Sequence, residues 1–423
     1  MKYHFIGDQG VSMRGLKKYL KVLGNTVTGS DIKTGGHKAE NITSNIDFVV
    51  KTSIEKNFPG YVEVEAALKN KNIKVLKRSE LLGRIVNGKK AIAVAGAHGK
   101  TTVTTMAGLL LQEAKFDPTV FVGGKVREFD DDVVRIGQSD WFVLEACEYD
   151  RSFLDIKPKI AIITNIEEEH LDTYPKGLDQ IREAFTQFLD NVPDDGLIIA
   201  CYDDQNVREV IEKTKSKAKV IFYGFNASKY NKLDFALKVP GKHNILNALS
   251  ILALADFLKI ERNVFKESIK DFLGARNRFE KIGEYNGADL IDDYGHHPTE
   301  IKLTIEALAE KYPDQKKIVV FWPHQNRRTN HLFDQFVKSF DLADEVIIKP
   351  IFFIEGRDEK SDLTSLDLAR EINKRGVKSS FYDSNEEIVD YLKDKLNKDT
   401  VLLTIGALPT SEISKTLIKM QNG

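Results

Sequence analysis

One segment of this chain constrains its fold more than any other, residues 91–102 with the sequence AIAVAGAHGKTT. Its first five residues are apolar and predict a buried strand of a parallel sheet. The strand breaks at Gly96, and residues 102–115 (TVTTMAGLLLQEAK) show the apolar spacing of a helix. The segment therefore predicts a strand, a glycine-rich turn and a helix, which together form one unit of an α/β fold.

The turn in this segment has the composition of a phosphate-binding loop. Glycines let the backbone approach phosphate oxygens, and the first N–H groups of a helix point outward. Lys100 adds a positive charge, and the Thr101 hydroxyl can bind Mg²⁺. The full Walker pattern has a glycine at the position of Val94, so this loop is a shortened variant, and a tight turn with a surface lysine is the alternative. The segment predicts ATP and Mg²⁺ as cofactors.

Composition limits the class of protein. A length of 423 residues predicts about three domains of ~150 residues. The net charge of -1 gives no general attraction for nucleic acid or an anionic membrane. No apolar run approaches the ~18 residues of a membrane span, and the start of the chain lacks the apolar core of a signal peptide. Two cysteines, Cys147 and Cys201, are too few for a disulfide framework, so we expect a cytoplasmic protein.

Strand and helix patterns alternate along the whole chain and predict three doubly wound α/β domains, over residues 1–88, 89–275 and 276–423. The first domain has predicted strands at 3–7, 26–29, 47–53 and 73–76 and helices at 13–23 and 61–69. The second has strands near 141–146, 160–166, 196–201 and 219–224, and its last helix is the apolar 244–258. The third has strands near 288–292, 317–322, 344–349, 379–382 and 401–405, with helices at 299–311 and 365–374.

Acidic residues follow two predicted strands of the second domain. Glu145 ends one strand, and open α/β sheets bind ligands at the carboxyl ends of their strands. Glu145 is therefore placed to help Thr101 hold Mg²⁺, although a solvated acid at a strand end is the alternative. His170 lies among carboxylates in residues 164–172 (TNIEEEHLD). It can bind a second metal ion through a neutral imidazole or form a structural hydrogen bond to a neighbouring acid.

The order of these motifs resembles the Mur ligase family, ATP-dependent enzymes that build the stem peptide of peptidoglycan. The resemblance covers nearly the whole chain. It rests on residues 4–7, 29–32, 96–102, 145–150, 164–172, 241–248, 276–280 and 291–300. Within the family, IDDYGHHPTE at 291–300 and Pro323-His324 with Arg328-Thr329 are most similar to the alanine-adding members.

This resemblance implies a reaction. We expect an ADP-forming ligase that joins L-alanine to the carboxylate of UDP-N-acetylmuramate through an acyl phosphate, in the cell-wall synthesis that supports cell shape and division. The partners expected are these small molecules and ATP, neither nucleic acid nor membrane, and the protein is expected to be a monomer or a homodimer. Developing charge on the transferred phosphoryl group would be offset by Lys100 and Mg²⁺.

The resemblance also implies a set of site residues. Those expected at ATP are Gly96, His98, Gly99, Lys100, Thr101, Thr102, Asn244, Asn247, Arg278 and Asp293, and those at the metal are Thr101, Glu145 and His170. Those expected at the UDP-sugar are Gly7, Gly10, Ser12, Met13, Asp31 and Ser53. Those expected at the amino acid are Tyr294, His297, His324 and Arg328. The catalytic set is Lys100, His170, His297, His324 and Arg328, with Arg328 as the bidentate carboxylate clamp and either His297 or His324 as a proton acceptor or a positioning group.

Several positions depart from the family pattern. Gln9 and Ser12 replace glycines, Cys147 replaces an aspartate, and Gln325 replaces an arginine. A tyrosine at position 149 is typical instead of the ligases that attach a preformed peptide. Such a ligase is the alternative within the family. Two other classes of protein are alternatives: a nicotinamide oxidoreductase, which the glycine spacing of the first domain disfavours, and a non-catalytic nucleotide-binding partner.

Overall fold

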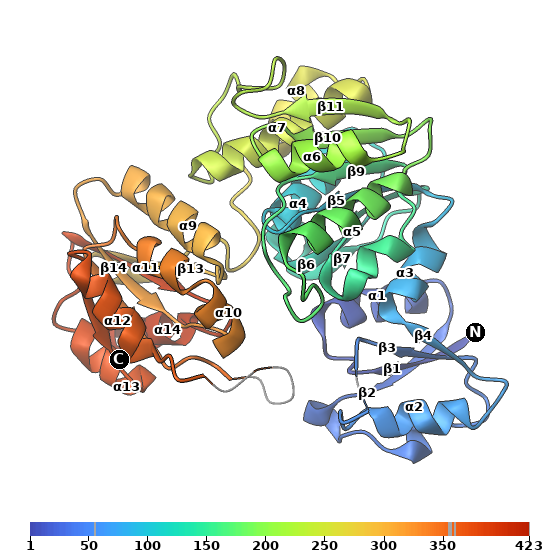
Figure 1. The fold of residues 1–423 in the computed structure, drawn as a ribbon, viewed down its shortest axis with the longest axis horizontal. Coiled ribbons are helices and arrows are strands. Elements are labelled where there is room, and N and C mark those ends of the chain that lie inside the picture. The colour runs from blue at the N-terminus through green and yellow to red at the C-terminus, as the bar shows by residue number, and fades with distance from the viewer. Residues whose placement is uncertain (55, 354–357, 359–360, 423) are drawn as a thin grey trace. The chain divides into compact units, whose positions relative to one another are not determined.

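The computed structural model describes residues 1–54, 56–353, 358 and 361–422, which form three β-sheets (Figure 1). Contacts divide the chain into two compact units. One unit contains Met1–Leu237 and Ile245–Phe272, and the other contains Lys238–Asn244 and Leu273–Gly423. The first unit holds two sheets and the second unit holds the third. The prediction of three α/β domains is confirmed.

The first sheet is small and parallel, with strand order β2-β1-β3-β4. Its strands are β1 (Lys2–Ile6), β2 (Thr26–Ser30), β3 (Phe48–Lys51) and β4 (Lys74–Lys77). Its helices are α1 (Val11–Val22), α2 (Tyr61–Leu68) and α3 (Arg78–Val86). The predicted bounds agree to within two residues, whereas α3 was not predicted.

The second sheet carries the glycine-rich turn and has the order β11-β10-β9-β5-β8-β6-β7. The strands are β5 (Lys90–Ala95), β6 (Thr119–Val126), β7 (Asp132–Arg135), β8 (Trp141–Glu145), β9 (Ile160–Ile163), β10 (Leu197–Cys201) and β11 (Lys219–Tyr223), of which β7 is antiparallel. The helices are α4 (Lys100–Glu113), α5 (Leu178–Asp190), α6 (Gln205–Lys213), α7 (Lys242–Phe257) and α8 (Arg262–Ile269). β5 is central, and Ala91 to Ala95 are fully buried, which explains the apolar run.

One prediction about this domain is wrong. Residues 244–258 were expected to form its last helix, but α8 follows α7. Only Phe265 and Ile269 of α8 are buried. A helix that buries two side chains leaves a weak apolar pattern, so its sequence signal is short.

The third sheet has the order β12-β13-β17-β14-β15-β16, with β12 antiparallel to β13. Its strands are β12 (Glu280–Tyr285), β13 (Ala288–Asp293), β14 (Lys316–Phe321), β15 (Glu345–Ile348), β16 (Lys378–Phe381) and β17 (Thr400–Ile405). Its helices are α9 (Pro298–Lys311), α10 (Asn326–His331), α11 (Phe333–Lys338), α12 (Ser365–Lys374), α13 (Asn385–Leu392) and α14 (Ser411–Asn422). The last strand, β17, lies between β13 and β14, so it holds together the two strands that precede the predicted amino-acid residues.

The parallel strands position the candidate sites. β5 pairs in parallel with both β8 and β9, so the segments that follow these three strands emerge at one edge of the second sheet. β1 likewise pairs in parallel with β2 and β3 in the first sheet. Within the described residues, none of the helices is both long enough and apolar enough to cross a membrane.

Candidate active site

The turn between β5 and α4 depends on two glycines with positive φ, 143° at Gly96 and 81° at Gly99. A Cβ atom on Gly96 would lie 2.0 Å from Oγ1 of Thr164, a distance that no side chain can occupy. Gly99 is the N-cap of α4, so no side chain caps the first turn of this helix. A helix start of this kind donates its first N–H groups to phosphate oxygens in nucleotide-binding proteins.

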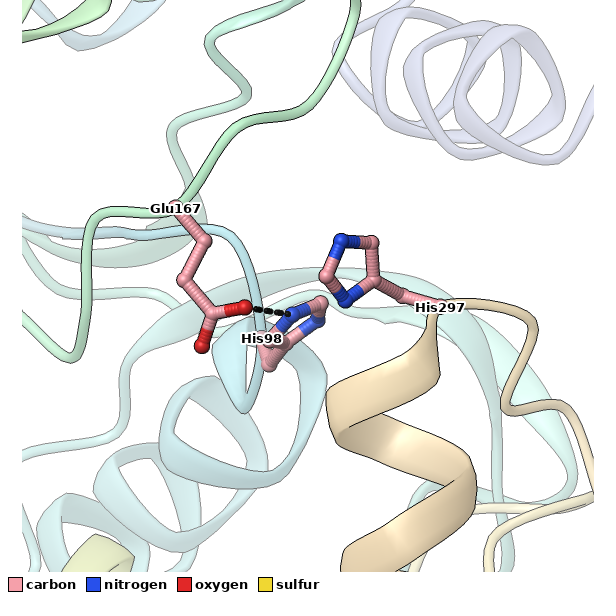
Figure 2. A group of neighbouring side chains, drawn as sticks. All are labelled: His98, Glu167 and His297. Atoms are coloured by element: carbon pink, nitrogen blue, oxygen red, sulfur yellow. Dashed lines mark ion pairs between the residues drawn. The ribbon is translucent and has the colours of Figure 1, made fainter. Parts of the chain in front are cut away.

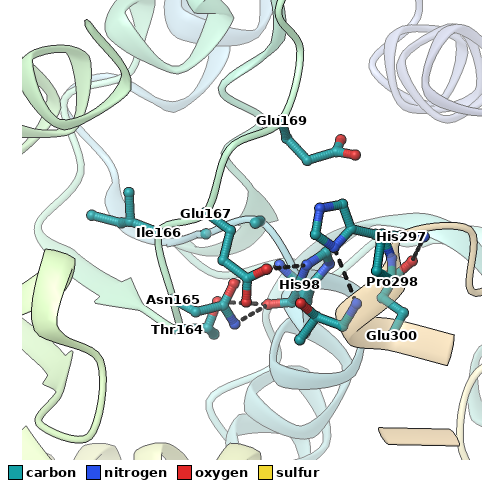
Figure 3. A network of polar contacts seen from close by, with 12 residues as sticks. His98, Thr164, Asn165, Ile166, Glu167, Glu169, His297, Pro298 and Glu300 are labelled. Carbon is teal, nitrogen blue, oxygen red and sulfur yellow. Dashed lines mark hydrogen bonds and ion pairs between the residues drawn. The ribbon is translucent and has the colours of Figure 1, made fainter. Parts of the chain in front are cut away.

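Two residues after β9 hold this phosphate loop. Thr164 Oγ1 donates to the carbonyl oxygen of His98 at 2.6 Å. Asn165 accepts from the backbone N–H of His98 at 2.8 Å and donates to its carbonyl at 3.1 Å (Figure 3). Because β5 and β9 are neighbours, these side chains reach the loop directly and fix its backbone.

Lys100 begins α4, and its ammonium group is bound by the protein itself. It donates to the carbonyl oxygens of Gly96 and Ala97, the latter at 3.0 Å. It also donates to both carboxylate oxygens of Glu148, at 3.1 and 3.3 Å. Burial opposes the charge, but the charge of Glu148 outweighs this effect and the pKa of Lys100 is raised. A phosphate group that binds this lysine therefore has to compete with Glu148.

Thr101 and Glu145 meet at the glycine segment of β6. Glu145 ends β8, and its Oε1 accepts a hydrogen bond from the backbone N–H of Gly123 at 2.5 Å. A Cβ atom on the next residue, Gly124, would lie 3.9 Å from the methyl group of Thr101. The structure thus brings two of the three predicted metal ligands to the same pair of glycines.

His170, the third predicted metal ligand, lies beside Glu169 and Glu148. Its Nε2 is 3.4 Å from Glu169 Oε2 and 3.7 Å from Glu148 Oε1. Burial lowers the pKa of His170, but a hydrogen bond with Cys147 and the charges of Glu169 and Glu148 outweigh it, and the pKa rises to about 9. The ring therefore carries a proton at neutral pH, which it must release before it can bind a metal ion.

The side chain of His98, in the phosphate loop, is oriented by Glu167. Figure 2 shows the Glu167 carboxylate directed at the His98 ring, and His98 Nε2 lies 3.4 Å from Glu167 Oε2. His98 is thus held at its backbone by Thr164 and Asn165 and at its ring by Glu167. All three come from the segment after β9, so this segment sets the shape of the loop.

The donors around the loop suit a hard cation. The Thr101 hydroxyl and the carboxylates of Glu145 and Glu148 offer oxygen atoms, which Mg²⁺ prefers. Glu148 lies beside Lys100, as described above. These residues fit Mg²⁺, and its binding here stays a prediction.

In the first domain, the loop after β1 and the loop after β2 are joined. The N–H groups of Gly7 and Asp8 donate to the carbonyl of Ser30, at 2.8 and 3.1 Å. Asp31 accepts from the backbone N–H of Gln9 at 3.4 Å. The structure therefore brings Asp31 to the Gly7 to Gly10 loop, with Ser12 in the first turn of α1. The Met13 side chain is fully buried in the core.

A buried carboxylate organises the loop that follows Asp31. Glu63, on α2, is fully buried. It is bound by groups from β1, β2 and the loop: Ser30 Oγ at 2.6 Å, Asn41 Nδ2 at 2.6 Å, Lys38 N at 3.1 Å, His4 Nε2 at 3.3 Å and His37 Nδ1 at 3.6 Å. Burial alone would raise the pKa of Glu63, but these hydrogen bonds lower it to about 2.

In the third domain, Arg278, Asp293 and Tyr294 lie together. Asp293 ends β13 and accepts hydrogen bonds from the N–H groups of Phe279 at 2.8 Å and Gly295 at 2.7 Å. Burial raises the pKa of Asp293 to about 6. The guanidinium of Arg278 lies over the ring of Tyr294, 5.2 Å from its centroid.

His297 begins the next helix. It is the N-cap of α9, and its Nδ1 accepts from the N–H of Thr299 at 3.3 Å (Figure 3). Glu300 completes the cap by accepting from the N–H groups of His296 and His297, at 2.9 and 3.3 Å. An acceptor at Nδ1 places the proton of a neutral ring on Nε2.

His324 and Arg328 follow β14. The His324 ring is stacked on the ring of Phe352, with their centroids 5.7 Å apart. Arg328 Nη1 donates a hydrogen bond to the backbone carbonyl of His324 at 3.4 Å. Between them, Gln325 has a φ of 71°, and its N–H donates to the Phe352 carbonyl at 2.9 Å. The Asp358 carboxylate accepts from the first two N–H groups of α10, at 2.7 and 3.0 Å. His324 and Arg328 are therefore neighbours, and their role at the amino acid stays a prediction.

Asn244 and Asn247, both expected at ATP, lie on α7 in different surroundings. Asn247 packs against the phosphate loop, because a Cβ atom on Gly99 would lie 2.8 Å from its Oδ1. Asn244 donates to the carbonyl of Pro240 at 2.7 Å, and its Nδ2 lies 3.1 Å from Nε2 of His243. Burial lowers the pKa of His243 to about 4, so its ring is neutral and Nε2 accepts.

Some residues of the site were not among those predicted. Glu148, Thr164 and Asn165 lie within motifs that resemble the family, but none of them was predicted to bind a ligand. The spacing of Glu145 and Glu148, two acids three residues apart after one strand, was a sequence signal for a role of Glu148. The hydrogen bonds of Thr164 and Asn165 span 66 and 67 residues, and spacing along the chain does not reveal them.

The phosphate loop lies at the edge of a largely parallel sheet, in the second of three α/β domains along the chain, and this is the organisation of a nucleotide-binding enzyme fold. Family models match along almost the whole chain: the Mur ligase family catalytic domain at residues 2–90, the Mur ligase middle domain at 94–255 and the Mur ligase glutamate ligase domain at 277–408. The chain belongs to the Mur ligase family, which confirms the expected family.

Two relatives that match nearly the whole chain are named as alanine-adding ligases. The UDP-N-acetylmuramate--L-alanine ligase of Clostridium acetobutylicum is 42% identical, over 96% of this chain and 95% of the relative. That of Caldanaerobacter subterraneus is 39% identical, over 99% and 97%. The crystal structure of UDP-N-acetylmuramate-alanine ligase from Thermotoga maritima has a TM-score of 0.81 at 25% identity, over 100% of this chain and 99% of that chain. A murein peptide ligase from Psychrobacter arcticus shares the fold, with a TM-score of 0.69 at 21% identity, over 99% of this chain and 98% of that chain.

Proposed function

We propose that this chain is an ATP-dependent ligase that joins L-alanine to the carboxylate of UDP-N-acetylmuramate in peptidoglycan precursor synthesis. One observation carries the proposal: a glycine-shaped loop that ends in a half-buried, charged Lys100 at the start of a helix. The alanine ligases of Clostridium acetobutylicum and Caldanaerobacter subterraneus support it through their identity over nearly the full chain.

The reaction needs an activated carboxylate. A carboxylate oxygen attacks the γ-phosphorus of ATP, ADP leaves, and an acyl phosphate forms. The amine of alanine then attacks the acyl carbon, releases phosphate and loses a proton. Lys100 offsets the charge on the transferred phosphoryl group, and Arg328 is suited to hold the carboxylate of alanine. Mg²⁺, when bound by oxygen donors such as Thr101 and Glu145, would neutralise further phosphate charge.

We assign one substrate to each domain. Residues 1–88 hold the UDP-sugar, residues 89–275 hold ATP, and residues 276–423 receive the amino acid. Asp31 beside the Gly7 to Gly10 loop supports the first assignment, and His324 beside Arg328 supports the third. A cytoplasmic location fits these substrates.

One alternative stays within the family, the attachment of a preformed peptide to the same sugar nucleotide. Tyr149 favours it, and its ring lies 5.0 Å from that of His170, next to the acids around Lys100. The names of the relatives at 42% and 39% identity favour alanine.

A competition among amines tests the proposal. The enzyme is given ATP, Mg²⁺ and UDP-N-acetylmuramate with L-alanine, glycine, L-serine or an L-alanyl tripeptide, and phosphate release is measured. We expect the highest kcat/KM with L-alanine. A higher kcat/KM with the tripeptide would assign the chain to the peptide-attaching ligases.

A further inference from the structure

Asp150 connects the first domain to the second. Ser53 Oγ, from the segment after β3, donates to Asp150 Oδ2 at 2.6 Å, and Lys77 Nζ, at the end of β4, donates to the same oxygen at 2.8 Å. The backbone N–H of Asp150 donates to Thr173 Oγ1 at 3.2 Å. Three separate segments therefore converge on this one residue.

The edge of the first sheet that Asp150 contacts suits an anionic ligand. Lys51 and Lys77 are the last residues of β3 and β4 and are register partners. Burial and the neighbouring charge of Lys77 lower the pKa of Lys51. One carboxylate thus faces two amines at the carboxyl edge of an open α/β sheet, where such folds bind ligands.

The other end of the same segment reaches Lys100. Glu148, two residues before Asp150, binds the Lys100 ammonium group at 3.1 Å. The Glu148 carbonyl accepts a hydrogen bond from the hydroxyl of Tyr174 at 2.6 Å, and Tyr174 is fully buried. We call residues 145–151 the acid loop. Its two anchors are Glu148, which binds Lys100, and Asp150, which contacts the first sheet.

The backbone of the acid loop is strained where it meets the first sheet. Asp150 and Arg151 have φ values of 51° and 53°, consecutive left-handed residues without a glycine. The ion pair there is not deeply buried, since the side chains of Lys77 and Asp150 are 44% and 31% exposed. An ion pair this exposed returns less stability than two strained residues cost, so stability alone does not explain the arrangement.

We infer that Asp150 is a positioning residue that transmits binding of the sugar nucleotide at the Ser53 and Lys77 edge to Glu148, and so to Lys100. An anion that binds this edge changes the partners of Asp150, and the short acid loop carries the change to the lysine. The sugar nucleotide and ATP then affect each other's affinity. The inference rests on the proposed function, because that function supplies the anionic sugar nucleotide.

The test measures binding coupling in the full chain. Calorimetry gives the affinity of a non-hydrolysable ATP analogue with and without saturating UDP-N-acetylmuramate. We expect the two affinities to differ at least ~5-fold in the wild type. Asp150→Asn keeps an acceptor for Ser53 and tolerates a left-handed φ, but removes the charge. Lys77→Met leaves the acid loop intact. Both should bring the ratio close to one. In Asp150→Asn each ligand alone should bind within about threefold of wild type. Lys77→Met, which removes a positive charge from the proposed sugar-nucleotide edge, should also weaken UDP-N-acetylmuramate alone while the ATP analogue alone stays within about threefold of wild type.

The matched control is Asp140→Asn, which breaks a comparable exposed pair, Lys89 Nζ to Asp140 Oδ1 at 2.5 Å. This control should keep the wild-type ratio. If Asp150→Asn and Lys77→Met both keep it as well, Asp150 is structural and the inference is wrong. A wild type that binds both ligands without coupling also overturns the inference and leaves the proposed function standing. A wild type that does not bind UDP-N-acetylmuramate overturns both.

Discussion

Replacing Glu63 by glutamine tests whether the buried carboxylate stabilises the loop after β2. The five groups on Glu63 converge from β1, from β2 and from the loop of residues 37–41. A glutamine has the same shape, but its amide nitrogen donates where the carboxylate accepted. It would face donors such as the N–H of Lys38 and the amide of Asn41. Glu63→Gln should therefore loosen the first sheet and the loop that carries Asp31.

The size of this stabilisation follows from the pKa of Glu63. The folded state lowers the pKa of Glu63 from 4.5 to about 2, and a tenfold change in proton affinity is worth ~1.4 kcal/mol. The ionised carboxylate therefore stabilises the fold by about 3 kcal/mol at neutral pH. Because the folded pKa is the lower one, this stability is present above pH 4.5 and is lost as the pH falls towards 2. Near pH 3 about 1 kcal/mol of it should remain.

Amide hydrogen exchange of peptides from β1 and β2 measures this effect in the intact chain, because it reports local opening free energy. In Glu63→Gln the opening free energy at pH 7 should fall by about 3 kcal/mol, and the difference from wild type should shrink as the pH is lowered. Glu65→Gln, on the exposed side of the same helix, is the control and should change nothing. A difference that stays constant between pH 7 and pH 3 would refute the reasoning.

Four further predictions concern turnover and binding. Lys100→Met should lower phosphate release about a hundredfold or more while circular dichroism stays unchanged, and near-normal release would contradict the role of the lysine. Gly96→Ala should weaken binding of an ATP analogue at least ~10-fold in calorimetry, because its Cβ would lie 2.0 Å from Thr164 Oγ1. Arg328→Met should raise KM for L-alanine about tenfold or more with little change in KM for ATP. Gln325→Arg should alter the ranking of glycine, serine and alanine, and an unaltered ranking would place Gln325 outside the pocket.

Local patterns predicted much of this fold. The strand, turn and helix around Gly96 follow from an apolar run, glycines and helical spacing, and all three lie where predicted. The hairpin of β6 and β7 was not predicted, because the glycines at 123 and 124 interrupt the alternation of apolar residues that marks a strand. The place of β17 between β13 and β14 is a long-range pairing, which no local pattern contains.

The candidate site likewise contains contacts that follow from local sequence and contacts that depend on long-range strand pairing. His324 lies beside Arg328 because the two are four residues apart. Arg278 lies over Tyr294 because the start of β12 is paired with the end of β13 in an antiparallel hairpin. The Lys100 to Glu148 pair spans 48 residues and arises only because β5 and β8 are neighbours in parallel. Electrostatic states such as the raised pKa of His170 depend on burial and on three-dimensional neighbours, and these are properties of the folded chain.

The central claim is that the chain activates a sugar-nucleotide carboxylate with ATP and transfers it to alanine. UDP-N-acetylmuramate labelled with ¹⁸O in its carboxylate provides the most direct measurement. With ATP, Mg²⁺ and L-alanine, mass spectrometry should show the alanine amide, ADP and inorganic phosphate that carries one ¹⁸O from the carboxylate. Phosphate without the label, or AMP and pyrophosphate in place of ADP and phosphate, would contradict the account.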